Sequence, residues 1–185
     1  MTGDGMLDLV LGPWWLENKG DGTFEVHQIA SGLEAGRCRV MDVNGNGRPD
    51  VLIGQEVLDY ETKSVPFSAV LWLECPEDPR SGDWPVHVID KVRCPHSLDV
   101  ADFDGDGEPE IVVGEHYPFA PYRNRSRLFI YKKADPGGLT WYRHCVDPRF
   151  EHHDGAKAIE LAPGRFGIIS TGWTEERYVH LWEPA

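Results

Sequence analysis

Oxygen-bearing side chains alternate with glycine in a nine-residue segment that occurs twice in the chain. One copy runs from Asp42 to Asp50 and the other from Asp102 to Glu110. In both copies an oxygen ligand stands at positions one, three, five and nine, and glycines at positions four and six let the backbone turn tightly. Calcium takes about six to eight such oxygen ligands. The spacing therefore predicts a calcium loop, although Asp-Gly and Asn-Gly pairs also form tight turns without a metal.

Each predicted calcium site uses four side chains and one main-chain carbonyl. The ligands are Asp42, Asn44, Asn46, Asp50 and the carbonyl of Arg48 at one site, and Asp102, Asp104, Asp106, Glu110 and the carbonyl of Glu108 at the other. The second site carries more carboxylates, so we expect it to bind calcium more tightly. An incomplete copy over residues 2–8 lacks the leading aspartate and should bind weakly or not at all. Residues 159–167 stand in the same register without the carboxylates, which predicts a fourth loop that binds nothing.

The loop belongs to a larger repeat. An aromatic-x-x-His-x-aliphatic pattern begins at Phe24, Trp84 and Trp141, and its histidine lies 23 positions before Asp50 in one copy and before Glu110 in another. Short β-branched or aromatic segments follow each loop and are bounded by glycine, proline and aspartate, with no convincing helical period. Four short strands in a repeat of about fifty residues are typical of a β-propeller blade.

The loop sequence, together with residues 15–24 (WLENKGDGTF), resembles the FG-GAP or VCBS repeat family over nearly the whole chain. That resemblance implies a calcium-bearing propeller of the kind found in integrin α-subunits and in many secreted bacterial proteins. It also implies an extracellular, periplasmic or cell-surface location for the complete protein. The resemblance is informative about fold and much less so about activity, because one fold hosts many functions.

We therefore expect an all-β fold, a partial propeller of about four blades, each a four-stranded antiparallel sheet. The blades should cover residues 1–33, 34–92, 93–150 and 151–185. The first repeat begins inside its loop, which predicts a fragment of a longer, about seven-bladed propeller. The alternative is self-association of half-propellers into a ring. In either case the chain alone should not behave as a closed monomer, because its terminal blades would expose strand edges.

Composition narrows the classes of partner. The formal net charge is −13, which argues against binding to nucleic acid or to an anionic membrane surface. No apolar run is long enough to span a bilayer, and no signal peptide is visible. The cysteines Cys38, Cys75, Cys94 and Cys145 show no metal-binding spacing, so we expect buried thiols in preference to a disulfide framework.

Residues that break the repeat are the candidates for function. His27, His87 and His144 recur at one place in the first three repeats, and the tryptophans Trp15, Trp72 and Trp182 follow the loops, so we expect both sets to pack within and between blades. Counting six positions outward from the loops instead selects Glu56, His96, His116 and His153, with His152 beside it. The inner strands should bring these side chains together at the mouth of the central channel. They could bind a second, zinc-like divalent metal or act in acid–base chemistry, or they could be a polar rim hydrogen-bonded to water and backbone.

Two insertions on the same face, residues 57–68 and 117–127, carry ring and arginine side chains suited to a ligand. Those of the second are Tyr117, Phe119, Tyr122, Arg123, Arg125 and Arg127. Our principal hypothesis is a calcium-stabilised propeller module of a secreted or surface protein that binds glycan or protein through its channel face. The alternative is an enzyme, because residues 152–155 (HHDG) and the late Gly172-Trp173 and Leu181-Trp182-Glu183 segments are similar to propellers of the aldos-2-ulose dehydratase type and related polysaccharide lyases. That similarity implies a metal-assisted elimination on a sugar, with His96, His116 and His153 as ligands or bases. A purely structural or adhesive repeat needs none of these residues.

Overall fold

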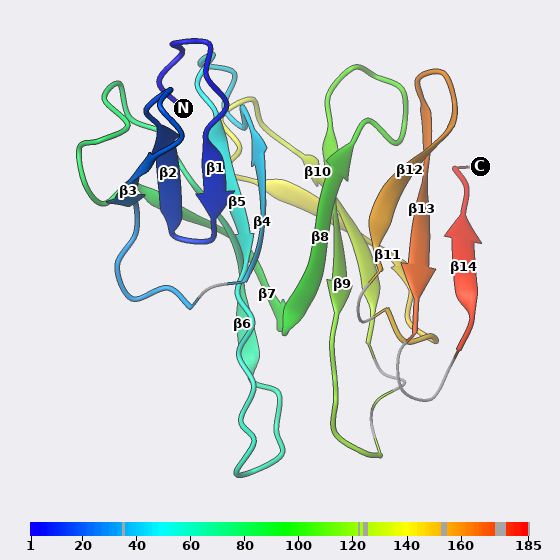
Figure 1. Ribbon diagram of the computed structural model, residues 1–185. Helices are drawn as coiled ribbons and strands as arrows, with labels where there is room; N and C mark the ends of the chain where they lie inside the picture. Colours follow the sequence, from blue (N-terminus) through cyan, green and yellow to red (C-terminus); the bar gives the residue numbers. More distant parts are fainter. Residues whose placement is uncertain (35, 122, 124–125, 153–154, 173–176, 185) are drawn as a thin grey trace.

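The computed structural model describes residues 1–34, 36–121, 123, 126–152, 155–172 and 177–184 (Figure 1). Within these residues the chain forms fourteen strands in four antiparallel sheets, arranged side by side along an arc. No helix in the described part of the chain is long and apolar enough to cross a membrane. The fold is an all-β partial propeller of about four blades, as the repeat predicted.

Each sheet is one repeat, and neighbouring strands in the sequence are neighbours in the sheet. The first blade consists of β1 (Leu9–Leu11), β2 (Trp14–Asn18) and β3 (Phe24–Gln28). The second consists of β4 (Arg37–Met41), β5 (Asp50–Gly54), β6 (Phe67–Leu73) and β7 (Val86–Arg93). The third consists of β8 (Pro95–Ala101), β9 (Glu110–Glu115), β10 (Leu128–Lys133) and β11 (Trp141–Asp147). The fourth consists of β12 (Lys157–Ala162), β13 (Arg165–Thr171) and β14 (Val179–Trp182).

The loops sort onto two opposite ends of the blades. The β8–β9 and β12–β13 connections lie at the upper end in Figure 1, whereas the β5–β6 and β9–β10 insertions lie at the lower end. The predicted fourth loop over residues 159–167 is wrong, since β12 continues to Ala162 and pairs there with Arg165. Without cage carboxylates to organise a wide loop, Pro163 and Gly164 make a short turn, with Gly164 at a φ of 72°.

The inner strands of three blades are tied together by one aspartate. Asp99 on β8 accepts a hydrogen bond from Arg39 Nε on β4 at 2.7 Å. It also accepts one from the backbone amide of Ala158 on β12 at 3.0 Å. Lys157 Nζ reaches the carbonyl of Leu98 at 3.2 Å. These contacts fix the inner strands of the second, third and fourth blades relative to one another.

Buried indoles fill the space between the first three blades. Trp15 and Trp72 are almost fully buried. Trp15 Nε1 donates to the carbonyl of Pro79 in the second blade at 3.3 Å, and Trp72 Nε1 donates to the carbonyl of Gly138 in the third at 3.1 Å. Each indole therefore crosses to the loop between the third and fourth strands of the next blade, and its ring contributes to the shared core.

Trp182 also packs between two blades, as predicted, but it faces the opposite way from Trp15 and Trp72. Trp15 and Trp72 pair with Val10 and Leu52, each the second residue after its loop. Trp182 pairs with Ile168, which is the first residue after the corresponding position 167. Because successive strand side chains point to opposite faces, its ring turns back toward the third blade. Its indole Nε1 donates to Ser170 Oγ at 3.0 Å.

The cysteines are free thiols. Cys75 and Cys94 are buried, as predicted, and burial raises their pKa to about 11 and about 12. Cys145 is exposed, so the prediction of a buried thiol is wrong at that position. It lies on β11, the outer strand of its sheet, which leaves its side chain uncovered.

Candidate functional site

The second-blade loop folds around its own oxygen atoms. The backbone amides of Asn46 and Gly47 donate to the two oxygens of Asp42 at 3.1 and 2.7 Å. The amide of Arg48 donates to Asn46 Oδ1 at 2.8 Å. Gly45 and Gly47 take φ values of 73° and 82°, which side chains with a Cβ adopt rarely. The loop is thereby curled so that its acidic and amide oxygens gather at one end of the blade.

The closing carboxylate of this loop is buried. Asp50 is fully buried at the start of β5 and accepts hydrogen bonds from the amides of Val43 and Cys75 at 2.9 and 2.8 Å. Burial raises the pKa of Asp50, and the two amides only partly offset that effect. A cation in the loop would stabilise the ionised carboxylate, so the residues present fit the predicted calcium ion.

The third-blade loop repeats this frame. Gly105 and Gly107 donate to the two oxygens of Asp102 at 2.7 and 2.9 Å, and the amide of Phe103 donates to Glu110 at 2.9 Å. Burial raises the pKa of Glu110 as it does that of Asp50. Oxygen atoms of Asp102, Asp104 and Glu110 lie within 4.8 Å of one another, close enough to share one ion.

A lysine from the same blade already contacts these acids. Lys132 Nζ on β10 lies against Asp104, 2.6 Å from Asp106 and 3.5 Å from Glu110. The adjacent carboxylates raise the pKa of Lys132, with Asp104 the largest contributor. Sequence spacing alone did not predict this contact, because Lys132 lies 22 residues beyond Glu110.

Two of the repeated histidines lie in sets of three side chains. In each set an imidazole stacks on an indole and reaches a glutamate. The sets are Trp15, Glu17 and His27 in the first blade, and Trp72, Glu74 and His87 in the second. The ring centroids are 4.5 and 4.3 Å apart, and both imidazole–carboxylate distances are 3.0 Å. The predicted packing role of these two histidines is confirmed, whereas His144 of the third blade is exposed and stands opposite Ile130.

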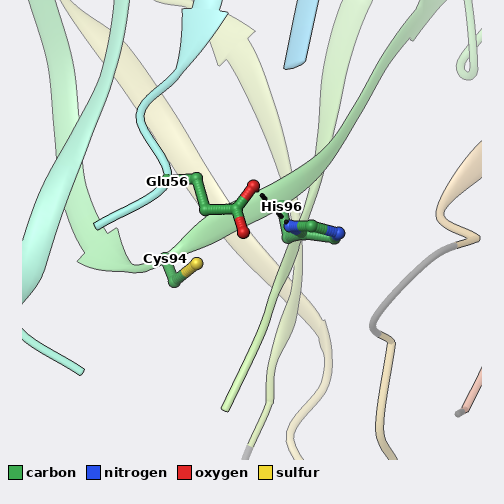
Figure 2. A group of neighbouring side chains, drawn as sticks. All are labelled: Glu56, Cys94 and His96. Carbon is green, nitrogen blue, oxygen red and sulfur yellow. Dashed lines mark ion pairs between the residues drawn. The ribbon is translucent and has the colours of Figure 1, made fainter. Parts of the chain in front are cut away.

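The channel-face residues converge in part. Glu56, Cys94 and His96 place their ligand atoms within 4.8 Å of one another, as Figure 2 shows. The ring of His116 lies 5.0 Å from that of His96, and its backbone amide donates to the carbonyl of Cys94 at 2.9 Å. These four residues come from the ends of β5, β7, β8 and β9. The propeller end therefore gathers Glu56, His96 and His116 as predicted, and it adds Cys94, which the sequence did not indicate.

Local backbone geometry aims this cluster. Pro95 pairs with Glu115 and Ser97 with Gly114, which leaves His96 as the extra residue of a β-bulge. Cys94 takes a φ of 39°, an unusual conformation for a residue with a side chain. Bulges and strained residues re-aim side chains and are frequent at functional sites. Neither feature has a simple sequence signature, although Pro95 beside Cys94 marks the break between β7 and β8.

The contact with Arg37 determines which ring nitrogen of His96 accepts a hydrogen bond. The guanidinium of Arg37 lies 3.1 Å from His96 Nε2, and a guanidinium can only donate. Nε2 therefore accepts, and the ring proton sits on Nδ1, which lies 3.0 Å from Glu56. A metal on Nδ1 would move that proton to Nε2, against another donor, whereas metal-bound histidines normally donate it to an acceptor. The cluster as arranged does not fit a zinc-like ion on His96.

The remaining predicted channel residues separate. His152 is fully buried and contacts Ser170 at 3.0 Å and Asp147 at 3.3 Å, and its ring lies 6.0 Å from Trp182. It thus packs into the fourth blade, and burial lowers its pKa to about 4. His153, predicted as a ligand or base, lies outside the described residues, as do Trp173, Tyr122 and Arg125.

The two insertions meet in an aromatic ridge, which we define as Tyr60, Phe67, Tyr117 and Phe119 with Arg93. The rings of Tyr60 and Phe119 contact edge-on at 5.6 Å, and those of Tyr117 and Phe119 at 6.4 Å. Arg93 lies over Phe67 at 4.7 Å and reaches Tyr117 at 5.9 Å. Tyr60 and Phe67 are 71% and 57% exposed, so the ridge offers ring faces to solvent.

Two arginines of the second insertion, Arg123 and Arg127, have partners within the protein. Arg127 makes a two-pronged contact with the buried carboxylate of Glu115 at 2.7 and 2.6 Å. Arg123 Nε donates to the carbonyl of Pro118 at 2.8 Å. These contacts hold the base of the insertion, and they leave the rings of the ridge as the surface best placed for a ligand.

The four blades and their loops define a β-propeller repeat protein. Two family models match the chain, one described as an FG-GAP-like repeat over residues 1–53 and one described as an FG-GAP repeat over residues 95–129. No curated protein matches the chain. The two matches support assignment of the chain to the FG-GAP repeat family, which confirms the resemblance read from the loops.

Proposed function

We propose that the protein is a calcium-stabilised propeller module that binds carbohydrate on the aromatic ridge. FG-GAP repeats are typical of extracellular or cell-surface proteins, so we place the complete protein in a secreted or surface setting. The observation that carries the binding role is the contact between Tyr60 and Phe119, because it joins the insertions of two blades into one surface.

Calcium has a structural role in this proposal. The ligands would be those predicted from the loops, and the ion would link the two inner strands of a blade at one end. It would offset the cost of ionising buried Asp50 and Glu110, whose pKa values burial raises. A ligand that binds only the folded state at about 100 times its Kd stabilises by about 2.7 kcal/mol. We therefore expect EDTA to lower the melting temperature of calcium-loaded protein by several degrees. An unchanged melt, in protein shown beforehand to hold calcium, would contradict this role.

The ridge suits sugars because ring faces stack on the apolar faces of pyranosides. Arg93, held over Phe67, adds a positive charge that favours sugars with a carboxylate. We expect an acidic oligosaccharide to bind, and we expect Phe67→Ala and Tyr60→Ala to weaken that binding about tenfold or more. Tyr142→Ala is the matched control, since Tyr142 is 69% exposed on β11, away from the ridge.

Calorimetric titration with a panel of neutral and acidic oligosaccharides tests this proposal. Equal loss in the Tyr142 variant, or no binding of any sugar in the panel, would contradict it. Capture of a protein by the same ridge in a cross-linking experiment would instead support the protein-binding form of the hypothesis.

The enzymatic alternative stays a prediction. The 5.0 Å separation of the His96 and His116 rings favours it, since two imidazoles at one channel mouth could exchange a proton with a sugar. Arg37 and Glu56 engage both ring nitrogens of His96, which argues against His96 as the base. Incubation with an acidic polysaccharide, followed by ultraviolet absorbance of the unsaturated sugar, distinguishes the two: binding without product supports the module.

A further inference from the structure

Strand pairing places three side chains at one repeat position. In the second blade Val51 pairs with Leu73, and in the third Ile111 pairs with Tyr131. Each of Val51 and Ile111 directly follows the closing acid of its loop. The residue that follows Leu73 at the end of β6 is Glu74, and the residue that follows Tyr131 on β10 is Lys132. Glu74 and Lys132 therefore occupy equivalent positions in the second and third blades. The same count from the Leu9–Leu16 pair gives Glu17 in the first blade.

The position therefore holds a carboxylate in two blades and an ammonium in the third. Glu74 Oε1 accepts a hydrogen bond from Asn44 in its own loop at 3.0 Å, and its other oxygen accepts from His87. Lys132 reaches into its loop instead, against Asp104 and 2.6 Å from Asp106. Two equivalent side chains thus approach equivalent loops with opposite charge.

The number of carboxylates in each loop explains why one blade has a glutamate at this position and the other has a lysine. Three carboxylates surround the second-blade loop, those of Asp42, Asp50 and Glu74, and the charges of Asp42 and Glu74 both act on Asp50. The third-blade loop has four carboxylates, those of Asp102, Asp104, Asp106 and Glu110, and one ammonium, that of Lys132. Counted over these side chains alone, each set sums to −3. In the third blade an ammonium contacts the loop carboxylates directly, whereas Arg48 of the second-blade loop donates to the carbonyl of Cys75.

We propose that Lys132 is a tethered counter-ion that competes with calcium for the third-blade loop, so that the second-blade loop is the tighter calcium site. This inference rests on the calcium part of the proposed function. It reverses the affinity order that carboxylate number alone predicts. Calcium entering the third loop must displace the ammonium from Asp104 and Asp106, two of its own ligands, whereas calcium entering the second loop meets Glu74 as an additional carboxylate.

Competition between calcium and the Lys132 ammonium follows from ordinary electrostatics. Calcium prefers the same carboxylate oxygens that an ammonium contacts, and the two cations repel at such short range. Exposed ion pairs are weak one by one, but Lys132 contacts two carboxylates of the same loop, so its loss should raise calcium affinity about three- to tenfold. Added salt should reduce the difference in calcium affinity between the unmodified chain and the Lys132 variant, because the third-blade loop is partly open to solvent.

The test is a calcium titration with a reporter in each loop. The backbone amides of Gly47 and Gly107 occupy the same position in the two loops, and each donates to the first aspartate. Their NMR resonances should shift as each loop fills. In the unmodified chain we expect Gly47 to saturate at lower calcium than Gly107. In Lys132→Gln we expect the Gly107 midpoint to fall about three- to tenfold while the Gly47 midpoint stays constant.

Two further variants keep this test specific. Lys91→Gln removes the same charge from β7, outside both loops, and should leave both midpoints unchanged. Glu74→Lys places an ammonium at the second-blade position and should raise the Gly47 midpoint. The counter-ion proposal is wrong if the Gly107 resonance saturates at lower calcium than the Gly47 resonance in the unmodified chain. It is also wrong if Lys132→Gln leaves the Gly107 midpoint unchanged. Absence of any calcium-dependent shift at either glycine in every variant removes the calcium proposal itself, a separate result.

Discussion

The interface between the second and third blades and the interface between the third and fourth are built from equivalent strand positions but filled differently. In the first of these, Trp72 crosses to the carbonyl of Gly138, which also accepts from Trp141 at 2.8 Å. In the second, Ile130 stands at the position of Trp72. A cleft of about 680 Å³ opens beside Ile130, lined also by Phe103, Tyr142 and Trp182. The interface of the second and third blades is filled by the indole of Trp72, whereas the interface of the third and fourth blades, which has Ile130 at that position, contains a cleft.

The three members of the Trp–His–Glu set change together. Where the indole is absent, the imidazole of His144 has no ring to stack on and becomes exposed. A carboxylate is then not needed to orient it, and the position of Glu74 is taken by Lys132. The set thus behaves as one unit: the indole fills the interface, the imidazole covers it, and the glutamate fixes the imidazole.

The largest effect we expect concerns this indole. Trp72→Ala should destabilise the protein by about 3–5 kcal/mol, because it removes a fully buried ring and leaves a cavity at the interface. Ile130→Ala should cost markedly less, about 1–2 kcal/mol, because Ile130 is half-buried beside a cleft that already exists. Chemical denaturation of both variants measures the difference. Equal losses would show that the two interfaces contribute alike and would break the comparison.

Most of the fold could be predicted from the sequence repeat. Loop spacing and the recurring histidines are local patterns, and they predict the short strands and their order along the chain. The short segment expected after the first loop is β1 (Leu9–Leu11). The failed fourth loop shows the limit of register counting, since a segment can keep its place in a repeat and lose the residues that shape it.

The site was harder to predict because its decisive contacts are long-range. Arg37 meets His96 across 59 positions, and nothing in the spacing of either residue indicates it. The bulge at His96 depends on pairing with β9, which no local motif specifies. Lys132 did leave a signal, since it follows Ile130 by two positions as Glu74 follows Trp72. Only the strand pairing shows that these positions are equivalent.

A smaller effect should separate the two interfaces by pH. Burial lowers the pKa of His152 to about 4, although Asp147 opposes the shift, whereas an unfolded histidine titrates near 6.5. The unfolded chain therefore binds a proton between these values and the folded chain does not. Stability from this group is complete above about pH 6.5 and is lost as pH falls toward 4, by at most about 1.4 kcal/mol per pH unit.

This titration belongs to the interface of the third and fourth blades, where His152 packs near Trp182. We expect unfolding free energies measured at pH 7 and pH 5 to differ less in His152→Asn than in the unmodified protein. The same comparison with His87→Asn reports on the interface of the second and third blades. If His152→Asn and His87→Asn reduce the pH dependence of the unfolding free energy equally, that dependence cannot be assigned to the interface of the third and fourth blades.

The smallest expected effect tests whether the glutamate acts through the imidazole. Glu74→Gln keeps the shape of the side chain but offers one acceptor where Asn44 and His87 both require one. We expect a loss of about 0.5–1.5 kcal/mol, the usual net value of a hydrogen bond. Glu183→Gln is the control, because Glu183 pairs with Arg165 on the surface and such pairs contribute little. If the set is one unit, the Glu74→Gln loss should largely disappear in a Trp72→Ala background, since the imidazole then has no ring to be held against. A double-mutant cycle in which the two losses simply add would show that Glu74 stabilises its loop directly and that the stacked pair stands without it.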